Sequence, residues 1–150
     1  LAHNGEINTL LGNVNWMKSH ETRMETDVFG RHLDALKPVI EAGASDSSAL
    51  DNVYELLVRA GRNAPHVQSL LIPDAWSYKR TMPEKLRDLY AYSNCVMEPW
   101  DGPAAIAATD GNWVIAGMDR NGLRPMRYTL MESGLLYVGS ESGMVHVTES

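Results

Sequence analysis

The sequence begins with Leu1-Ala2-His3-Asn4-Gly5-Glu6-Ile7-Asn8-Thr9, a strand-like run that ends in His-Asn-Gly and turns directly into a helical pattern. At such a turn the carboxamide of Asn4 lies beside the unhindered backbone N–H of Gly5. Two donors of this kind can converge on one oxygen, which is the geometry of an oxyanion hole. An Asn-Gly pair is also a common plain turn, so these two residues alone leave both interpretations open.

Composition restricts the class of protein. The chain has 150 residues, 44% of them hydrophobic and 21% charged, which is ordinary for a globular protein. We expect residues 1–150 to form part of a single domain. The net charge of −6 gives no basic surface for nucleic acid, and no apolar run approaches the ~20 residues that a membrane span needs. The single cysteine, Cys95, excludes an intrachain disulfide and suits a reducing compartment, so we expect a cytoplasmic location.

Hydrophobic spacing predicts mostly helices in the first two thirds of the chain. Gly12 and Asn13 weaken the first of these helices and predict a break or an irregular turn there. The clearest helix start is Gly43-Ala44-Ser45-Asp46-Ser47-Ser48, where side-chain oxygens can accept from the free N–H groups of the first turn. In order, the sequence predicts a strand over 1–3, helices over 6–20, 29–40, 46–60, 65–71 and 83–95, and a loop over 20–27.

The last third of the chain changes to apolar runs separated by turn residues. Strands are predicted over 104–109 and 113–118, joined at Asp110-Gly111, and over 127–130 and 135–138. Helices followed by antiparallel strands indicate an α+β protein in which helices are layered on a sheet.

Other polar residues are candidates for chemistry. Asp46 suits either helix capping or binding of a substrate ammonium group, and both are compatible if Ser45 is the cap. The loop from Asp119 to Pro125 favours a structural role, with Arg120 and Arg124 bracing acidic partners. The five histidines have no metal-binding spacing, and Cys95 is expected to be a buried, inert thiol.

Five segments together resemble one family over essentially the whole chain, in the family's own order. The sequence is similar to the class II glutamine amidotransferase domain of the glutamate synthase large subunit. The segments are Ala2 to Thr9, Asn15-Trp16-Met17, Gly43 to Asp51, Met97 to Ala105 and Asp119 to Tyr128. A departure is Leu11, where an arginine is usual.

The resemblance implies an N-terminal-nucleophile hydrolase fold, an αββα sandwich that is incomplete in this chain because the N-terminal strands and the nucleophile would lie upstream. In that family an N-terminal cysteine attacks the side-chain amide of glutamine, and its own α-amine is the base. Asn4 and Gly5 match the oxyanion-hole donors, and Asp46 matches the aspartate that holds the α-ammonium group of the substrate. Without the cysteine, the isolated chain is expected to be inactive, and with an unpaired sheet edge it is expected to be poorly soluble or only partly ordered.

The resemblance also implies partners outside these residues. The released ammonia would serve glutamate formation from 2-oxoglutarate in synthase domains of the same polypeptide, which in the family carry FMN and an iron–sulfur cluster. Electrons would come from a small NADPH-oxidising subunit or from ferredoxin. The alternatives are a degenerate, non-catalytic module that senses glutamine or serves structure, and another class II amidotransferase.

Overall fold

The structure, a computed structural model, describes residues 1–146 as a mixture of helices and antiparallel strands. The elements follow in chain order, with η marking 3₁₀ turns. They are β1 (Ala2–Gly5), α1 (Leu10–Glu21), η1 (Gly30–Leu36), α2 (Asp46–Arg59), α3 (Ala64–Leu71), η2 (Trp76–Tyr78), α4 (Glu84–Val96), β2 (Ala104–Thr109), β3 (Val114–Met118), β4 (Arg127–Leu130) and β5 (Leu136–Gly139).

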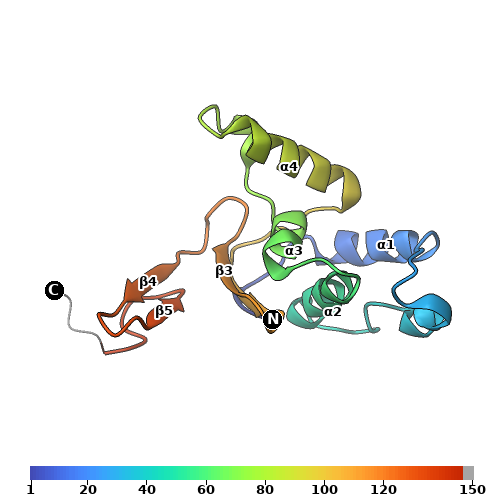
Figure 1. The fold of residues 1–150 in the computed structure, drawn as a ribbon, viewed down its shortest axis with the longest axis horizontal. Coiled ribbons are helices and arrows are strands. Elements are labelled where there is room, and N and C mark those ends of the chain that lie inside the picture. The colour runs from blue at the N-terminus through green and yellow to red at the C-terminus, as the bar shows by residue number, and fades with distance from the viewer. Residues whose placement is uncertain (147–150) are drawn as a thin grey trace.

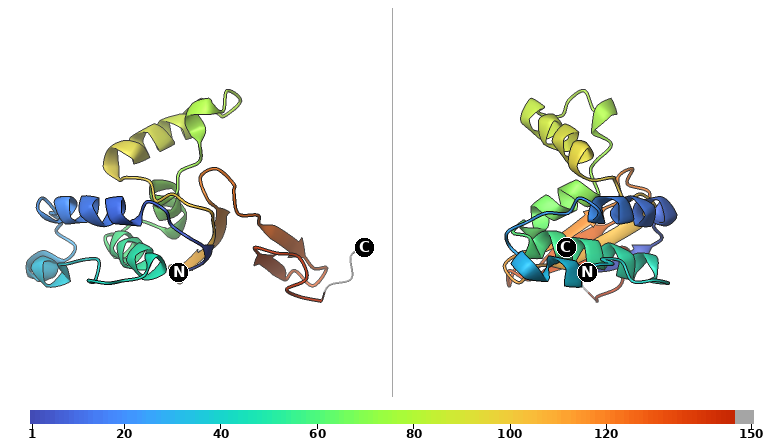
Figure 2. Two further views of the ribbon diagram at one scale, coloured as in Figure 1. Left: turned by 180° about the vertical axis from the view of Figure 1, so that it is seen from behind. Right: turned by 90° about the vertical axis from the view of Figure 1, so that its right-hand side faces the viewer.

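The strands form two separate sheets. β1, β2 and β3 make a three-stranded antiparallel sheet in that order, and β4 pairs with β5 in a two-stranded hairpin. The three-stranded sheet stands between the helices on one side and the hairpin β4–β5 on the other, as both directions of view agree (Figures 1 and 2). The prediction of an α+β protein with helices layered on a sheet is confirmed.

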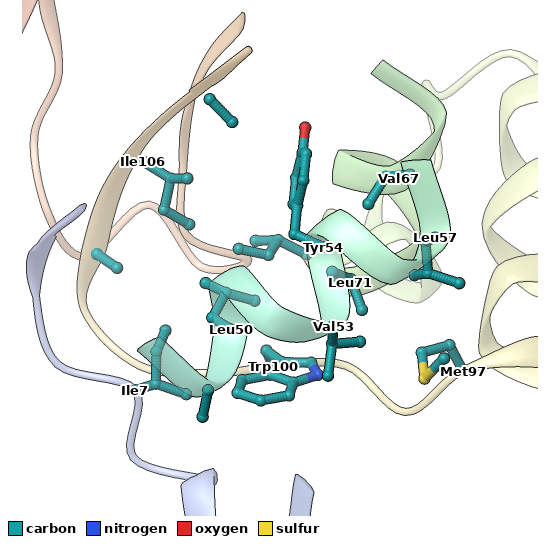
Figure 3. Close-up of a cluster of buried hydrophobic side chains, with 14 of the residues drawn as sticks. Ile7, Leu50, Val53, Tyr54, Leu57, Val67, Leu71, Met97, Trp100 and Ile106 are labelled. Atoms are coloured by element: carbon teal, nitrogen blue, oxygen red, sulfur yellow. The ribbon is translucent and has the colours of Figure 1, made fainter. Parts of the chain in front are cut away.

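The core lies between the helices and the covered face of the three-stranded sheet. Helix α2 carries an apolar stripe in which Leu50 and Val53 are fully buried, and Ile106 meets it from β2. Trp100 closes one side of the same cluster, as Figure 3 shows. Burial of each large apolar side chain contributes about 1.5–3 kcal/mol, so this layer is the main source of stability.

The end of β1 crosses closely over the segment that precedes β2. The N–H of Glu6 donates to the carbonyl of Pro103 (3.1 Å), and the N–H groups of Asn8 and Thr9 donate to that of Asp101 (2.7 and 3.2 Å). These bonds hold residues 6–9 against residues 101–103 on a path that is not helical, so α1 begins at Leu10 and the predicted start was wrong. We call residues 5–9 and 101–103 the crossing.

Two glycines make the crossing possible. A Cβ on Gly5 would lie 1.8 Å from the carbonyl oxygen of Pro103, and one on Gly102 would lie 2.0 Å from that of Glu6. Both glycines also have a positive φ, of 134° and 154°. No other residue fits at either position without moving backbone.

Helix α1 runs unbroken through Gly12 and Asn13, against the prediction of a break. Asn13 is buried, and its side chain is satisfied by donating to the carbonyl of Pro99 (3.1 Å) and accepting from the hydroxyl of Thr9 (2.6 Å). A polar side chain with such partners ties α1 to the crossing, and this offsets its low helix propensity.

Two further predictions were wrong. The predicted helix over 29–40 is a 3₁₀ segment, Gly30–Leu36, which buries none of its residues and so lacks the packing that stabilises an α-helix. Cys95 was expected to be buried, but it is exposed, because α4 directs Ser93 rather than Cys95 toward the rest of the protein. In the described part of the chain, no helix has both the length and the apolar character needed to cross a membrane.

Candidate active site

Asn4 lies on the edge strand β1, and polar groups from a distant part of the chain meet its side chain. Its amide nitrogen donates to the hydroxyl of Ser140 (2.7 Å), and the guanidinium of Arg124 donates to its amide oxygen (2.5 Å). Arg124 precedes β4 and Ser140 follows β5. The two flanks of the hairpin therefore hold the carboxamide of Asn4.

A cavity of about 660 Å³ lies between the three-stranded sheet and the hairpin, and Asn4 lines it. Its other walls are mostly small or apolar side chains, among them Ala105, Ile115 and Val138. Its size falls in the usual range for small-molecule sites. The cavity places the carboxamide of Asn4 beside space that a small substrate can enter.

Asp46 is the first residue of α2, and Ser45 before it is the N-cap, whose hydroxyl accepts from the N–H of Ser48 (3.2 Å). The carboxylate of Asp46 accepts from the N–H of Ile7 (2.9 Å) and from that of Ser47 (2.8 Å). Burial opposes ionisation of Asp46, but these hydrogen bonds outweigh it and hold the pKa of the carboxyl below its ordinary value. A carboxylate has about four lone-pair sites, so acceptor capacity remains for a substrate ammonium group.

His3 joins Asp46 to β1, a contact that the sequence reasoning missed. Its side chain is only 2% exposed, and its Nε2 lies 2.8 Å from the hydroxyl of Ser47 and 3.5 Å from the carboxylate of Asp46. Side chains alternate across a strand, so His3 faces the helices while Asn4 faces the hairpin. The structure thus brings Asn4, Gly5 and Asp46 to the same end of β1, although within residues 1–146 no hydrogen bond joins Asn4 to Asp46 and Asp46 does not line the cavity at Asn4.

Asp119 organises the loop that carries Arg124. Its buried carboxylate accepts from the backbone N–H groups of Ala104, Asn121, Leu123 and Arg124 at 2.9 to 3.2 Å. Burial raises the pKa of Asp119, but the four hydrogen bonds outweigh this effect and place it below the ordinary value. The structural role predicted for this loop is confirmed.

The predicted partner of Arg124 needs correction. An acidic residue was expected as the partner of Arg124. Within residues 1–146 the only carboxylate within ion-pair distance of Arg124 is that of Glu141, at 3.9 Å. The guanidinium instead donates a direct hydrogen bond to the amide oxygen of Asn4. Arg120, the other arginine of this loop, forms no ion pair in the described part of the chain. Cys95 is on α4, which packs on α3 and η2 rather than on β1. Residues 1–146 contain no group of three side chains that could hold a metal ion.

Comparison with known proteins identifies the family of this chain. The family model of the class II glutamine amidotransferases matches residues 1–150. The chain belongs to this family. Its relatives include the glutamate synthase [NADPH] large chain of Azospirillum brasilense, which is 61% identical over 150 residues, or all of this chain and 10% of that protein.

Two further relatives of this amidotransferase chain are also named glutamate synthase. The glutamate synthase [NADPH] large chain of Bacillus subtilis is 45% identical over 99% of the chain and 10% of that protein, and the glutamate synthase [NADH] of Saccharomyces cerevisiae is 47% identical over all of the chain and 7% of that protein. The chain therefore spans about a tenth or less of the length of these relatives.

Proposed function

We propose that this chain is part of a domain that hydrolyses the side-chain amide of glutamine and releases ammonia for glutamate synthesis from 2-oxoglutarate in the same parent polypeptide. The observation that carries the proposal is the arrangement at the end of β1, where Asn4 lines a cavity, Gly5 follows it directly and Asp46 binds the backbone of Ile7. The family and the names of the relatives support the same reaction.

Asn4 and Gly5 would act on the transition state. A thiolate that attacks the carbonyl carbon of the amide forms a carbon–sulfur bond and places negative charge on the oxygen. The amide N–H of Asn4 and the backbone N–H of Gly5 would stabilise that charge, and one such donor contributes ~10²–10³ in turnover. The α-amine of the cysteine passes the thiol proton to the leaving nitrogen, so ammonia leaves as the carbon–nitrogen bond breaks, and water then releases glutamate from the thioester.

Asp46 would hold the α-ammonium group of glutamine. Its lowered pKa keeps it ionised at neutral pH, and its bonds to Ile7 and Ser47 fix the direction of the carboxylate. A charge-assisted hydrogen bond of this kind distinguishes an amino acid from a neutral amide.

The nucleophile would be an N-terminal cysteine of the parent polypeptide, upstream of Leu1. We propose that the three-stranded sheet and the hairpin β4–β5 belong to the two β layers of an N-terminal-nucleophile hydrolase sandwich. On this proposal the purified 150-residue chain has no glutaminase activity, and detectable turnover by it would contradict the assignment of the nucleophile.

Other parts of the parent would supply the redox chemistry. An iron–sulfur cluster requires several thiolate ligands, and this chain has one cysteine, so its own residues do not fit such a group. We therefore assign FMN and the cluster to the synthase domains, with a small NADPH-oxidising subunit or ferredoxin as the electron donor. A cytoplasmic location fits the reducing conditions that these groups need.

The test uses the parent polypeptide and an electrophilic glutamine analogue, with the adduct located by peptide mass mapping. We expect the adduct on an N-terminal cysteine, and we expect Asp46→Asn to raise KM for glutamine ~10–100-fold, as the loss of a charge-assisted hydrogen bond implies. Asp51→Asn on the same helix is the matched control and should leave KM unchanged. An adduct on Cys95 would contradict the proposed site.

The other interpretations predict different results. A degenerate sensing module would bind glutamine without forming an adduct, and a structural module would do neither. Another class II amidotransferase would form the adduct, but its ammonia would not reach 2-oxoglutarate. The block Trp100-Asp101-Gly102-Pro103 favours the glutamate synthase assignment.

A further inference from the structure

We propose that Arg124 is a positioning residue for the oxyanion hole, which orients the carboxamide of Asn4 so that an N–H faces the reacting carbonyl. The inference rests on the proposed function, because it assigns Arg124 a role in the same site. Sequence reasoning gave Arg124 only a bracing role, and its contact with Asn4 is visible only in the structure.

The chemistry of the guanidinium decides which way the amide points. A carboxamide has an accepting oxygen and a donating nitrogen of nearly the same shape, so rotation by about 180° exchanges them at little steric cost. A guanidinium has donors and no acceptor, so only the oxygen of Asn4 can face it. The hydrogen bond from Nη2 of Arg124 to Oδ1 of Asn4 therefore directs Nδ2 away from the arginine.

The nitrogen of Asn4 then has one N–H available for a substrate. Ser140 accepts one of its two hydrogens, at 2.7 Å. Within residues 1–146 the other hydrogen has no partner, and it can point into the cavity that Asn4 lines. If the amide were reversed, its oxygen would take the place of the donor and would repel an oxyanion.

The charge of Arg124 also strengthens that donor. A cation bound to the amide oxygen draws electron density from the nitrogen, which makes the remaining N–H a better hydrogen-bond donor. Arg124 thus acts through Asn4, without touching the substrate.

The backbone of Arg124 is held in place by the carboxylate of Asp119. Asp119, 6% exposed, accepts from the backbone N–H of Arg124 at 2.9 Å and from that of Leu123 at 2.9 Å. The same carboxylate accepts from the N–H of Ala104, the residue that pairs with Gly5. One buried carboxylate therefore fixes the loop of Arg124 relative to the strand that carries Asn4.

The experiment is a double-mutant cycle in the parent polypeptide, with kcat and KM of glutamine hydrolysis as the readouts. We expect Asn4→Ala to lower kcat by ~10²–10³ and Arg124→Ala to lower it by ~10–100, both with KM within about threefold. The decisive variant is the double substitution. Because Arg124 acts through Asn4, the double variant should be no slower than Asn4→Ala alone.

Two further measurements separate positioning from a structural role. Added methylguanidinium should restore part of the kcat of Arg124→Ala but none of the kcat of Asn4→Ala. Arg124→Lys, which keeps a donor-only side chain, should retain more activity than Arg124→Ala, and it replaces the alanine variant if that variant does not fold. The matched control is Arg127→Ala, at an exposed arginine three residues along, which should leave kcat unchanged.

The measurements distinguish a failure of the role proposed for Arg124 from a failure of the proposed oxyanion hole. Multiplicative losses in the double variant, or a rise in KM with kcat unchanged, would overturn the role of Arg124 and leave the proposed function standing. If Asn4→Ala itself has no effect on kcat, the proposed oxyanion hole is wrong and this inference falls with it.

Discussion

The crossing and the hairpin β4–β5 both reach the end of β1, but they are built in opposite ways. The crossing is held by backbone hydrogen bonds and leaves no room for a side chain at Gly5 or Gly102. Among residues 1–146 the strands of the hairpin pair only with each other, and the hairpin exposes apolar side chains such as Tyr128 (77%) and Leu130 (67%). It reaches Asn4 through side chains on its two flanks.

The difference separates two tasks. Backbone contacts fix where the peptide of Asn4 and Gly5 lies, since neither partner can move without breaking several hydrogen bonds. Side-chain contacts from the hairpin set only how the carboxamide of Asn4 is turned. Substitutions in the crossing should therefore affect folding, whereas substitutions on the flanks of the hairpin should affect catalysis.

The largest effect is expected for Gly5→Ala. A Cβ there would meet the oxygen of Pro103 at 1.8 Å and the backbone has a φ of 134°, so we expect a loss of roughly 3 kcal/mol of stability. Thermal unfolding and soluble yield of the parent polypeptide measure it. Gly111→Ala is the matched control, because Gly111 has a positive φ but open space around it, and it should cost about 1 kcal/mol. Equal losses would mean that the crossing is not tightly packed.

A smaller loss is expected for Asn13→Ala. The change leaves the carbonyl of Pro99 and the hydroxyl of Thr9 without this buried partner, which costs about 1–3 kcal/mol. Asn15→Ala, at an exposed position on the same helix, should be neutral or slightly stabilising. Thermal unfolding of both variants decides whether the side chain of Asn13 ties α1 to the crossing.

Acid should loosen the loop of Arg124. The folded-state pKa of Asp119 is depressed, so its stabilising contribution is present above the unfolded-state value of about 3.9 and is lost as pH falls through the folded-state value. We expect the hydrogen-exchange protection factors of Leu123 and Arg124 to decrease when the pH is lowered below about 4. Asp119→Asn should show reduced protection at neutral pH, and unchanged protection in acid would contradict the role of the carboxylate.

The smallest effect is expected for Ser140→Ala. Asn4 keeps its bond to Arg124 and loses one neutral hydrogen bond, worth about 0.5–1.5 kcal/mol. We expect kcat of glutamine hydrolysis in the parent polypeptide to change by less than about threefold, with exposed Ser142→Ala as the control. A tenfold loss would show that Ser140, and not Arg124 alone, turns the carboxamide.

Local patterns were sufficient for much of the fold. Helix α2 has an apolar stripe and a capping serine, and β4 has its predicted bounds, because both depend on residues close in the sequence. The start of α1 could not be predicted, since Thr9 is bonded to Asp101, 92 residues away. The segment at 29–40 had helical spacing, but its 3₁₀ part, Gly30–Leu36, buries none of its residues and so lacks the packing that stabilises an α-helix.

The candidate site likewise contains residues that local motifs could indicate and contacts that only the structure shows. Asn4, Gly5 and Asp46 were selected from short motifs and from the family resemblance, and their roles stay predictions. The contact of His3 with Ser47 and that of Arg124 with Asn4 join segments far apart in the sequence. A lone histidine or arginine gives no signal of such a partner.

The crossing also sets an order of events during synthesis. Thr9 and Asp101 are separated by 92 residues, so at ~5–20 residues per second β1 waits on the order of 5–18 s for the segment that fixes it. Its neighbour in the sheet, β2, is made later still. During that interval β1 lacks β2, its neighbour in the sheet, and a chaperone that shields β1 at this stage would protect the nascent chain from aggregation.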